Sequence, residues 1–379
     1  MSANRRRAGC TRVAFFFAAL GLSACAAPTT PSVAPVSPAA QSYAALAPPA
    51  EADFVVHDFR FASGETLPEL RIHYRTYGKP ERGADGRVTN AVLVLHGTGG
   101  SGAQFVNARF AGELFTPGGL LDARRMFVIL PDDLGHGQSS KPSDGLHARF
   151  PQYRYRDMVE AEYRLVREGL GVEHLRLVLG TSMGGMHTWL WGEEHPDSMD
   201  ALMPLASLPT QISGRNRAWR RLIIDAIRHD PAWRGGEYET APPSLRTAAE
   251  MLFFMSSNPV QRQAAGPTLA AADAALDAFA ADFVAKNDAN DILYALESSA
   301  DYDPGPKLEK IRAPLLAVNT ADDLINPPEL GVLEHEIQRV PRGHAVVLPL
   351  SPQTSGHGTH TSAAVWKHLL ERLLQQSTP

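Results

Sequence analysis

Ser182 lies in a sequence pattern that can make a serine hydroxyl reactive. Residues 180–184 read Gly-Thr-Ser-Met-Gly, and the apolar segment 177–179 comes directly before them. A sharp turn between a strand and a helix holds such a serine in a strained conformation and exposes its hydroxyl above the sheet. Flanking glycines let the helix pass the strand closely. The segment therefore predicts a nucleophilic serine that forms a covalent acyl intermediate.

A serine hydroxyl is a poor nucleophile until a base takes its proton, so we expect an acid and a histidine later in the chain, in that order. Asp322 and Asp323 end the apolar segment 314–321. A strand there places a carboxylate at the edge of the sheet where α/β proteins bind ligands. We assign Asp323 as the acid, with Asp322 as the alternative; the other aspartate then caps a helix or lies in a solvated turn.

His357 is the predicted base, because it lies in a glycine-flanked loop before the final helix-like segment. His360 is the alternative. A metal site at these two histidines is disfavoured, since no His-Glu-x-x-His pattern or nearby ligand cluster accompanies them. In the assigned roles, Nε2 of His357 accepts the proton of Ser182, and Asp323 holds Nδ1.

A glycine-rich loop is expected to supply the oxyanion hole. Residues 96–100 read His-Gly-Thr-Gly-Gly directly after the apolar segment 91–95. We predict the backbone amides of Thr98 and Met183 as the two donors. A phosphate-binding loop is disfavoured, because neither Gly-Lys-Ser/Thr nor Gly-x-Gly-x-x-Gly follows. No metal and no cofactor are predicted.

Short apolar segments alternate with helix-like segments, which predicts an α/β fold with a doubly wound, mostly parallel sheet. Residues 54–61 and 69–77 alternate in polarity as an opening antiparallel hairpin does. The further strands are expected at 91–95, 126–130, 175–179, 201–205, 314–318 and 345–348. Helices are expected at 155–169, 185–194, 328–338 and 361–375. Residues 211–306 are long, alanine-rich and helical, and we interpret them as a helical cap between core segments 51–210 and 307–379.

The amino terminus has the composition of a bacterial export signal. Residues 1–25 contain Arg5, Arg6 and Arg7, then the apolar run 13–22. Residues 22–25 read Leu-Ser-Ala-Cys, which resembles a lipoprotein lipobox in which Cys25 is acylated. The alternative is an ordinary signal peptide cut nearby. Residues 26–50 are dominated by Pro, Ala, Ser and Thr, which predicts a disordered tether from a lipid-anchored Cys25.

Charge and cysteine content restrict the partners. The chain has a net charge of −5, and loss of a leader with four arginines and no acid leaves −9, which argues against nucleic acid. Cys10 leaves with the leader, so no thiol pair remains for a disulfide. We expect a small-molecule acyl substrate and a position on the periplasmic side of the cell envelope, with the outer membrane favoured. The oligomeric state stays open, with a homodimer among the alternatives.

Several motifs resemble the homoserine O-acetyltransferase branch of the α/β-hydrolase superfamily. They are the elbow at 180–186, cap segments at 213–217, 230–238 and 288–294, the acid motif at 323–328 and the base motif at 356–357. The resemblance implies an α/β-hydrolase fold with an inserted helical cap, and it assigns Asp323 and His357 the acid and base roles. Residues 96–100 instead follow the pattern of ordinary esterases.

We therefore expect an exported, lipid-anchored serine hydrolase that cleaves a small ester, with an amide or a thioester as further substrate types. Acetyl-CoA, the donor implied by the resemblance, is a cytosolic compound, so water is the acceptor available to an exported enzyme. The first alternative is acyl transfer to an alcohol or an amino acid hydroxyl. The second alternative is a noncatalytic envelope lipoprotein with the same fold.

Overall fold

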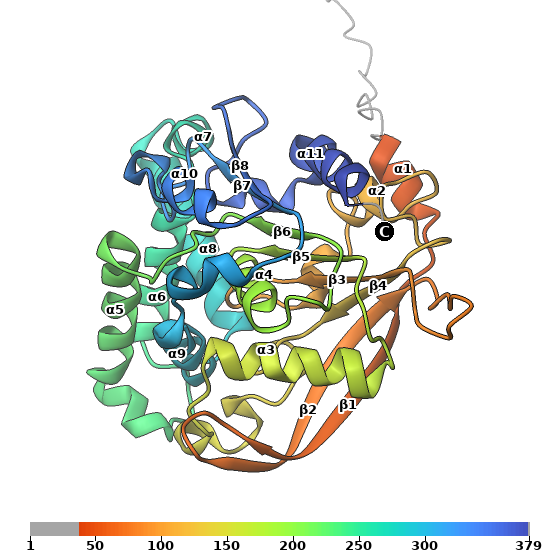
Figure 1. Ribbon diagram of the computed structural model, residues 1–379. Coiled ribbons are helices and arrows are strands. Elements are labelled where there is room, and N and C mark those ends of the chain that lie inside the picture. The colour runs from red at the N-terminus through yellow and green to blue at the C-terminus, as the bar shows by residue number, and fades with distance from the viewer. Residues whose placement is uncertain (1–37, 378–379) are drawn as a thin grey trace, which may run out of the picture. The chain divides into compact units, whose positions relative to one another are not determined.

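The computed structural model describes residues 38–377, in which eight strands form one sheet in the order β1-β2-β4-β3-β5-β6-β7-β8 (Figure 1). The hairpin of β1 (Ala50–Arg60) and β2 (Thr66–Tyr77) is antiparallel, and β2 also pairs antiparallel with β4 (Phe127–Pro131). All other neighbours are parallel. They are β3 (Ala91–Leu95), β5 (Leu177–Thr181), β6 (Leu202–Leu205), β7 (Leu315–Thr320) and β8 (Gly343–Leu348). The predicted hairpin and mostly parallel sheet are confirmed.

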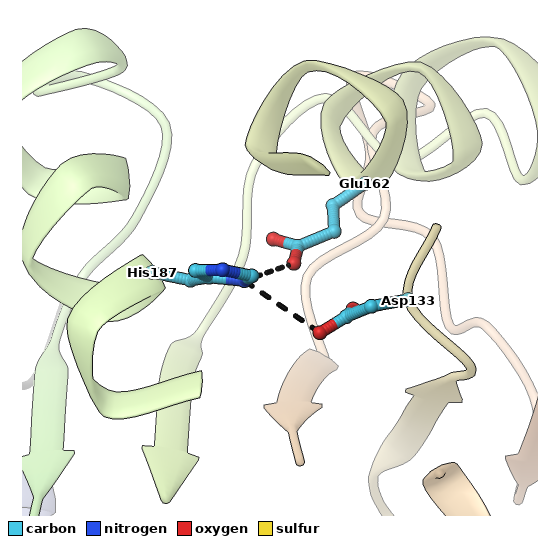
Figure 2. Close-up of side chains that lie close together, drawn as sticks. All are labelled: Asp133, Glu162 and His187. Atoms are coloured by element: carbon cyan, nitrogen blue, oxygen red, sulfur yellow. Dashed lines mark hydrogen bonds and ion pairs between the residues drawn. The ribbon is translucent and has the colours of Figure 1, made fainter. Parts of the chain in front are cut away.

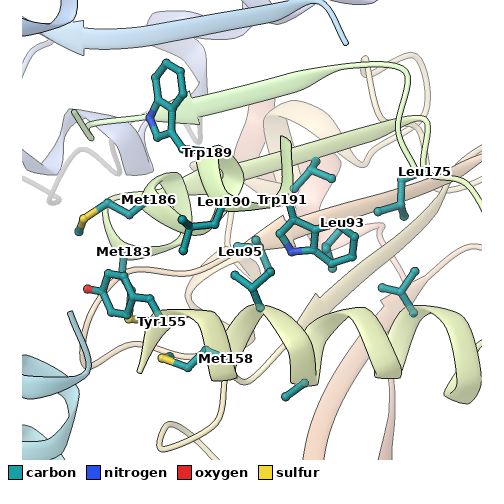
Figure 3. Packing of buried hydrophobic residues seen from close by; sticks show 14 of the residues in the cluster. Leu93, Leu95, Tyr155, Met158, Leu175, Met183, Met186, Trp189, Leu190 and Trp191 are labelled. Atoms are coloured by element: carbon teal, nitrogen blue, oxygen red, sulfur yellow. The ribbon is translucent and has the colours of Figure 1, made fainter. Parts of the chain in front are cut away.

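Both faces of the sheet are covered, which explains why the parallel strands are apolar at nearly every position. In β3, Leu93 and Leu95 belong to one buried cluster, whereas Val92 and Val94 belong to another. The first cluster includes side chains of α3 (Tyr155–Arg164) and α4 (Met183–Glu194), as Figure 3 shows around Met158. The second includes side chains of α2 (Ala111–Leu114) and α11 (Ala363–Gln376). After α3 the chain continues in a π-helical turn, Leu165–Gly169.

Five helices lie between β6 and β7 in the sequence, and most of them contribute to a third hydrophobic cluster, which also includes Ile325 after β7. They are α5 (Gly214–Arg228), α6 (Ser244–Met255), α7 (Pro259–Ala265), α8 (Leu269–Lys286) and α9 (Ala289–Glu297). The cluster contains Ile223, Leu245 and Leu293 from three of them. Helix α8 packs on α6 through Phe279 and Phe253, whose ring centroids are 5.3 Å apart. We refer to these five helices as the cap.

The predicted disordered tether at 26–50 is wrong for its last part, because residues Pro38–Ala44 form helix α1 and β1 begins at Ala50. The hydroxyl of Tyr43 donates a hydrogen bond of 2.9 Å to the carbonyl of Val106. Gly112 lets α1 approach α2, since a Cβ there would lie 2.6 Å from the carbonyl oxygen of Ala39. A tertiary contact thus orders a segment whose composition indicates disorder.

The expected helix at 328–338 is broken. Gly331 has φ +65°, and it separates the 3₁₀ turn Pro328–Leu330 from α10 (Val332–Glu336), which is followed by a second 3₁₀ turn, Ile337–Arg339.

The predicted signal peptide, the lipobox and Cys25 lie outside the described residues. None of the helices in residues 38–377 combines the length and the apolar composition that crossing a bilayer requires.

Asp291 joins the cap to the core and makes stability depend on pH. Its carboxylate accepts hydrogen bonds from the backbone N–H and the hydroxyl of Ser143, at 2.9 and 2.7 Å. Burial raises the pKa of Asp291 to about 6. Folding therefore favours the uncharged acid, and the stability that Asp291 contributes is present below about pH 4 and lost as the pH rises through about 6.

We predict that Asp291→Asn raises the melting temperature relative to the parent protein at about pH 8 but not at about pH 4, because the amide keeps the shape and stays neutral. Thermal unfolding at the two pH values measures this difference. Asp282→Asn, on the exposed face of α8 beside Lys286, is the control and should show no such pH dependence. If Asp291→Asn changed the melting temperature equally at both pH values, this would contradict the raised pKa of Asp291.

Candidate active site

Ser182 lies at a tight crossing between β5 and α4. Its backbone has φ 55° and ψ −109°, a strained conformation for a residue with a side chain. A Cβ on Gly180 would lie 1.9 Å from the carbonyl oxygen of Gly184. A Cβ on Gly184 would lie 2.2 Å from the carbonyl oxygen of Leu95. Glycine is therefore required at both positions, and the crossing leaves Ser182 half-buried at the carboxyl edge of the sheet.

The structure brings together the three residues that we predicted as a triad. Oγ of Ser182 lies 2.8 Å from Nε2 of His357, and Nδ1 of His357 lies 2.9 Å from Oδ2 of Asp323. A carboxylate only accepts hydrogen bonds, so Nδ1 carries the proton and Nε2 is free to accept the proton of Ser182. Asp323 follows β7 and His357 follows β8, and these parallel strands end at the same edge of the sheet as β5, with β6 between β5 and β7.

Asp323 is held as a carboxylate. Its Oδ1 accepts hydrogen bonds from the backbone N–H groups of Ile325 and Asn326, at 2.8 and 3.0 Å. Burial alone would raise the pKa of this carboxyl group, but the electrostatic attraction of the His357 imidazole, its hydrogen bond and the two backbone hydrogen bonds hold the pKa below the usual value. The acid therefore stays ionised and can stabilise an imidazolium.

The two alternative residues lie close by but make other contacts. Asp322 accepts hydrogen bonds from the side chain of Asn258 and from the backbone N–H of Gly356, the latter at 2.9 Å. It therefore ties the loop that carries His357 to the cap. The ring centroid of His360 lies 5.2 Å from that of His357, and burial lowers the pKa of His360 to about 3, which keeps its imidazole neutral.

Both predicted oxyanion-hole donors are near Ser182 and unpaired. Within residues 38–377, the backbone N–H groups of Thr98 and Met183 donate no hydrogen bond. Met183 follows Ser182 directly, and a Cβ on Gly97 would lie 3.4 Å from Cβ of Ser182. The loop is fixed by His96, whose Nδ1 lies 2.8 Å from the carbonyl oxygen of Gly97. Such preset, unpaired donors are what stabilisation of an oxyanion requires.

Arg220 in the cap is a residue that sequence reasoning missed. Its side chain is 2% exposed, and its guanidinium bonds to Oδ1 of Asn216 (3.1 Å) and to Oγ of Ser299 (3.3 Å). No carboxylate of the described chain forms an ion pair with it. Together with Thr98 it faces the buried hydroxyl of Tyr155. The spacing of Asn216 and Arg220 by four residues in a helix was the available signal.

A cavity of about 440 Å³ lies beside the acid, between the start of the cap and the loop after β7. Met186, Arg215, Tyr302 and Asp323 are among its lining residues. Its lining among the described residues does not include Ser182, so this cavity alone does not define the acyl-binding site.

One group of three buried side chains outside the triad has the composition of a metal-ligand set. Asp133, Glu162 and His187 lie close together in the core (Figure 2). None of them contacts the reacting hydroxyl of Ser182.

Comparisons with known proteins agree with this geometry. A family described as alpha/beta hydrolase fold matches residues 90–361. A protein named "Probable acyltransferase" from Methanothermobacter thermautotrophicus is 32% identical over 298 residues, which cover 78% of this chain and 89% of that protein. A homoserine O-acetyltransferase from Pelobacter propionicus is 32% identical over 306 residues, covering 71% and 81%. The crystal structure of esterase E22 has a TM-score of 0.76 at 19% identity and covers 86% of this chain and all of that one.

We predict that a fluorophosphonate probe labels Ser182 and that His357→Gln slows this labelling by at least about a hundredfold, because the serine loses its base. His360→Gln is a matched control and should change the rate only a few-fold. Mass spectrometry of the labelled peptide identifies the residue, and the time course gives the rate. An unlabelled parent protein would favour a noncatalytic role, and a larger effect of His360→Gln would reverse the assignment of the base.

Proposed function

Because this chain belongs to the α/β-hydrolase family, in its homoserine O-acetyltransferase-like branch, we propose that it is a serine hydrolase that cleaves a small ester. An amide or a thioester is a further substrate type. The hydrogen-bonded series from Ser182 through His357 to Asp323 carries this proposal. Family membership by itself indicates an enzyme of the esterase and acyltransferase kind.

The geometry supports a two-step reaction through an acyl-Ser182 intermediate. Oγ of Ser182 attacks the carbonyl carbon of the ester while Nε2 of His357 takes the hydroxyl proton. The N–H groups of Thr98 and Met183 stabilise the oxyanion, and Asp323 stabilises the imidazolium. The imidazolium then gives its proton to the departing alcohol. In the second step His357 deprotonates a water molecule that attacks the acyl carbon, which releases the acid and restores Ser182.

Two observations favour water as the acceptor. Ser182 is half-buried rather than sealed, so water can reach the acyl-enzyme. A transferase, in contrast, has to exclude water from that intermediate. In addition, residues 96–100 follow the pattern of esterases.

Acyl transfer to an amino acid hydroxyl is the second candidate, and Arg220 is the observation that favours it. A buried guanidinium without an acidic partner is costly, and a substrate carboxylate would neutralise it through two hydrogen bonds. The names of the relatives point to the same reaction class.

We also propose that the enzyme is exported and held at the periplasmic side of the envelope by lipid chains on Cys25. The basic start, the short apolar run and the Leu-Ser-Ala-Cys sequence of residues 1–25 support this proposal. The tether would consist of residues 26–37, because helix α1 begins at Pro38.

We predict that Ser182→Ala lowers kcat/KM for an aryl acetate by about a thousandfold or more, because the acyl-enzyme can no longer form. Release of the aryl alcohol measures the rate. Ser63→Ala, in the exposed turn between β1 and β2, is the control and should keep the parent rate. An unchanged rate in Ser182→Ala would contradict the proposed nucleophile.

The same assay decides between water and a hydroxyl acceptor when homoserine and acetyl-CoA are added and the products are separated. If water is the acceptor, acetate forms both with and without homoserine and acetyl-CoA, and no O-acetylhomoserine forms. Formation of O-acetylhomoserine that is lost in Arg220→Lys, which keeps the charge but not the paired donors, would favour the second candidate.

We predict that Cys25→Ser moves the protein from the detergent phase to the aqueous phase and abolishes labelling by palmitate, because the acylated thiol is lost. Phase partition of bacterial extracts measures this change. Cys10→Ser, inside the predicted leader, is the matched control and should stay lipidated. If the parent protein loses its leader but is not labelled by palmitate, the ordinary signal peptide would be favoured.

A further inference from the structure

We propose that Asp133, Glu162 and His187 bind one divalent transition-metal ion of the Zn²⁺ class in the protein core. The proposal is independent of the hydrolase reaction. Asp133 follows β4, Glu162 lies in α3 and His187 lies in α4, so the ion would join three elements.

The three side chains converge. Nδ1 of His187 lies 2.7 Å from Oε1 of Glu162 and 3.6 Å from Oδ2 of Asp133, and one ligand atom from each residue lies within 4.8 Å of the others. Figure 2 shows both carboxyl groups directed at the imidazole. Metal–ligand distances of about 2.0–2.2 Å place neighbouring ligand atoms roughly 3–3.5 Å apart in a tetrahedron, so small side-chain movements suffice to bind an ion.

The site is buried and its charges are not balanced by the protein. Asp133 is 1% exposed, Glu162 2% and His187 0%. Among the described residues, both carboxylate oxygens of Asp133 and Nε2 of His187 have no hydrogen-bond partner. Within residues 38–377, no lysine or arginine forms an ion pair with either acid. Burial raises the pKa of both carboxyl groups, because a charged carboxylate is unfavourable in this interior, and the neighbouring Glu162 raises the pKa of Asp133 further. A divalent cation would neutralise both carboxylates at once.

The groups around the site leave the carboxylates available as ligands. Nε1 of Trp191 donates to Oε2 of Glu162 at 2.6 Å, which orients this carboxylate as an outer partner of a metal ligand does. Nε2 of His96 accepts a hydrogen bond from the backbone N–H of Asp133 at 3.0 Å, so His96 has no proton there for the Asp133 carboxylate. The second oxygen of Asp133 could serve as a fourth donor, which would give a distorted four-coordinate ion because the two oxygens of one carboxylate lie close together.

A metal ion at this place would have a structural effect on the active site. Helix α4 begins directly after Ser182 and carries His187. Asp133 also fixes His96, whose carbonyl oxygen accepts a hydrogen bond of 2.8 Å from the backbone N–H of Gly184. The ion would therefore hold the turn at Ser182 and the glycine-rich loop in one arrangement. A closed ligand set in the core leaves no open position for a reaction at the metal.

The test is the metal content of the full chain, purified without a polyhistidine tag and without chelators. Elemental mass spectrometry and native mass spectrometry should find about one divalent ion per folded chain. Asp133→Asn and His187→Gln should each lower the occupancy about tenfold or more, because one ligand is removed. Asp200→Asn is the matched control, since Asp200 lies 2.7 Å from His174 in another histidine–carboxylate pair, and it should keep the parent content.

A second measurement keeps the proposal testable if these variants do not fold. The parent protein is produced in medium supplemented with Co²⁺, and its visible absorption spectrum should show the bands of Co²⁺ with nitrogen and oxygen ligands. A folded parent protein that contains no ion after growth with Zn²⁺ and with Co²⁺ overturns the proposal. The two carboxyl groups would then share a proton. Fluorophosphonate labelling of the same samples reports on Ser182 separately, so the two proposals fail independently.

Discussion

The close crossing of β5 and α4 is the constraint on which the candidate active site depends. It requires glycine at 180 and 184, since a Cβ at either position would overlap a carbonyl oxygen. The crossing forces positive φ on Ser182 and brings the backbone N–H of Gly184 to the carbonyl of His96. The same crossing therefore determines the backbone positions of both Ser182 and the glycine-rich loop at residues 96–100. The buried clusters on both faces of the sheet stabilise this strained turn, as the free energy of many apolar contacts outweighs one unfavourable conformation.

Parallel topology explains how residues far apart in sequence meet. Ser182, Asp323 and His357 each follow a strand, and these strands end at the same edge of the sheet. Once the three side chains are close, their types and the short hydrogen bonds between them determine which atoms carry the protons. Backbone N–H groups fix one oxygen of Asp323 and leave the other for His357, so orientation of the imidazole does not depend on any mobile side chain.

The sequence was sufficient to predict the sheet and the choice of Ser182, Asp323 and His357, because a local motif, chain order and apolar strands carry that information. The group of Asp133, Glu162 and His187 was missed, since it is assembled from separate elements without a spacing pattern. Arg220 was missed although its four-residue spacing from Asn216 was a signal, because that spacing alone does not show that the guanidinium is buried. Helix α1 was missed because its order comes from the contact of Tyr43 with Val106. The break at Gly331 depends on one positive φ inside a helix-like pattern. The roles of Cys25 and of residues 1–25 stay predictions.

Asp322, adjacent to the acid, has a consequence for how substrate enters. Its carboxylate bonds both to Asn258, at the start of α7, and to the backbone of Gly356, one residue before the base. Gln261 in α7 reinforces this link by donating to the carbonyl of Thr354 at 2.6 Å. Swinging α7 outward as a lid would therefore pull on the histidine loop and disengage it from the nucleophile. Substrate entry that leaves α7 in place would keep His357 hydrogen-bonded to Ser182.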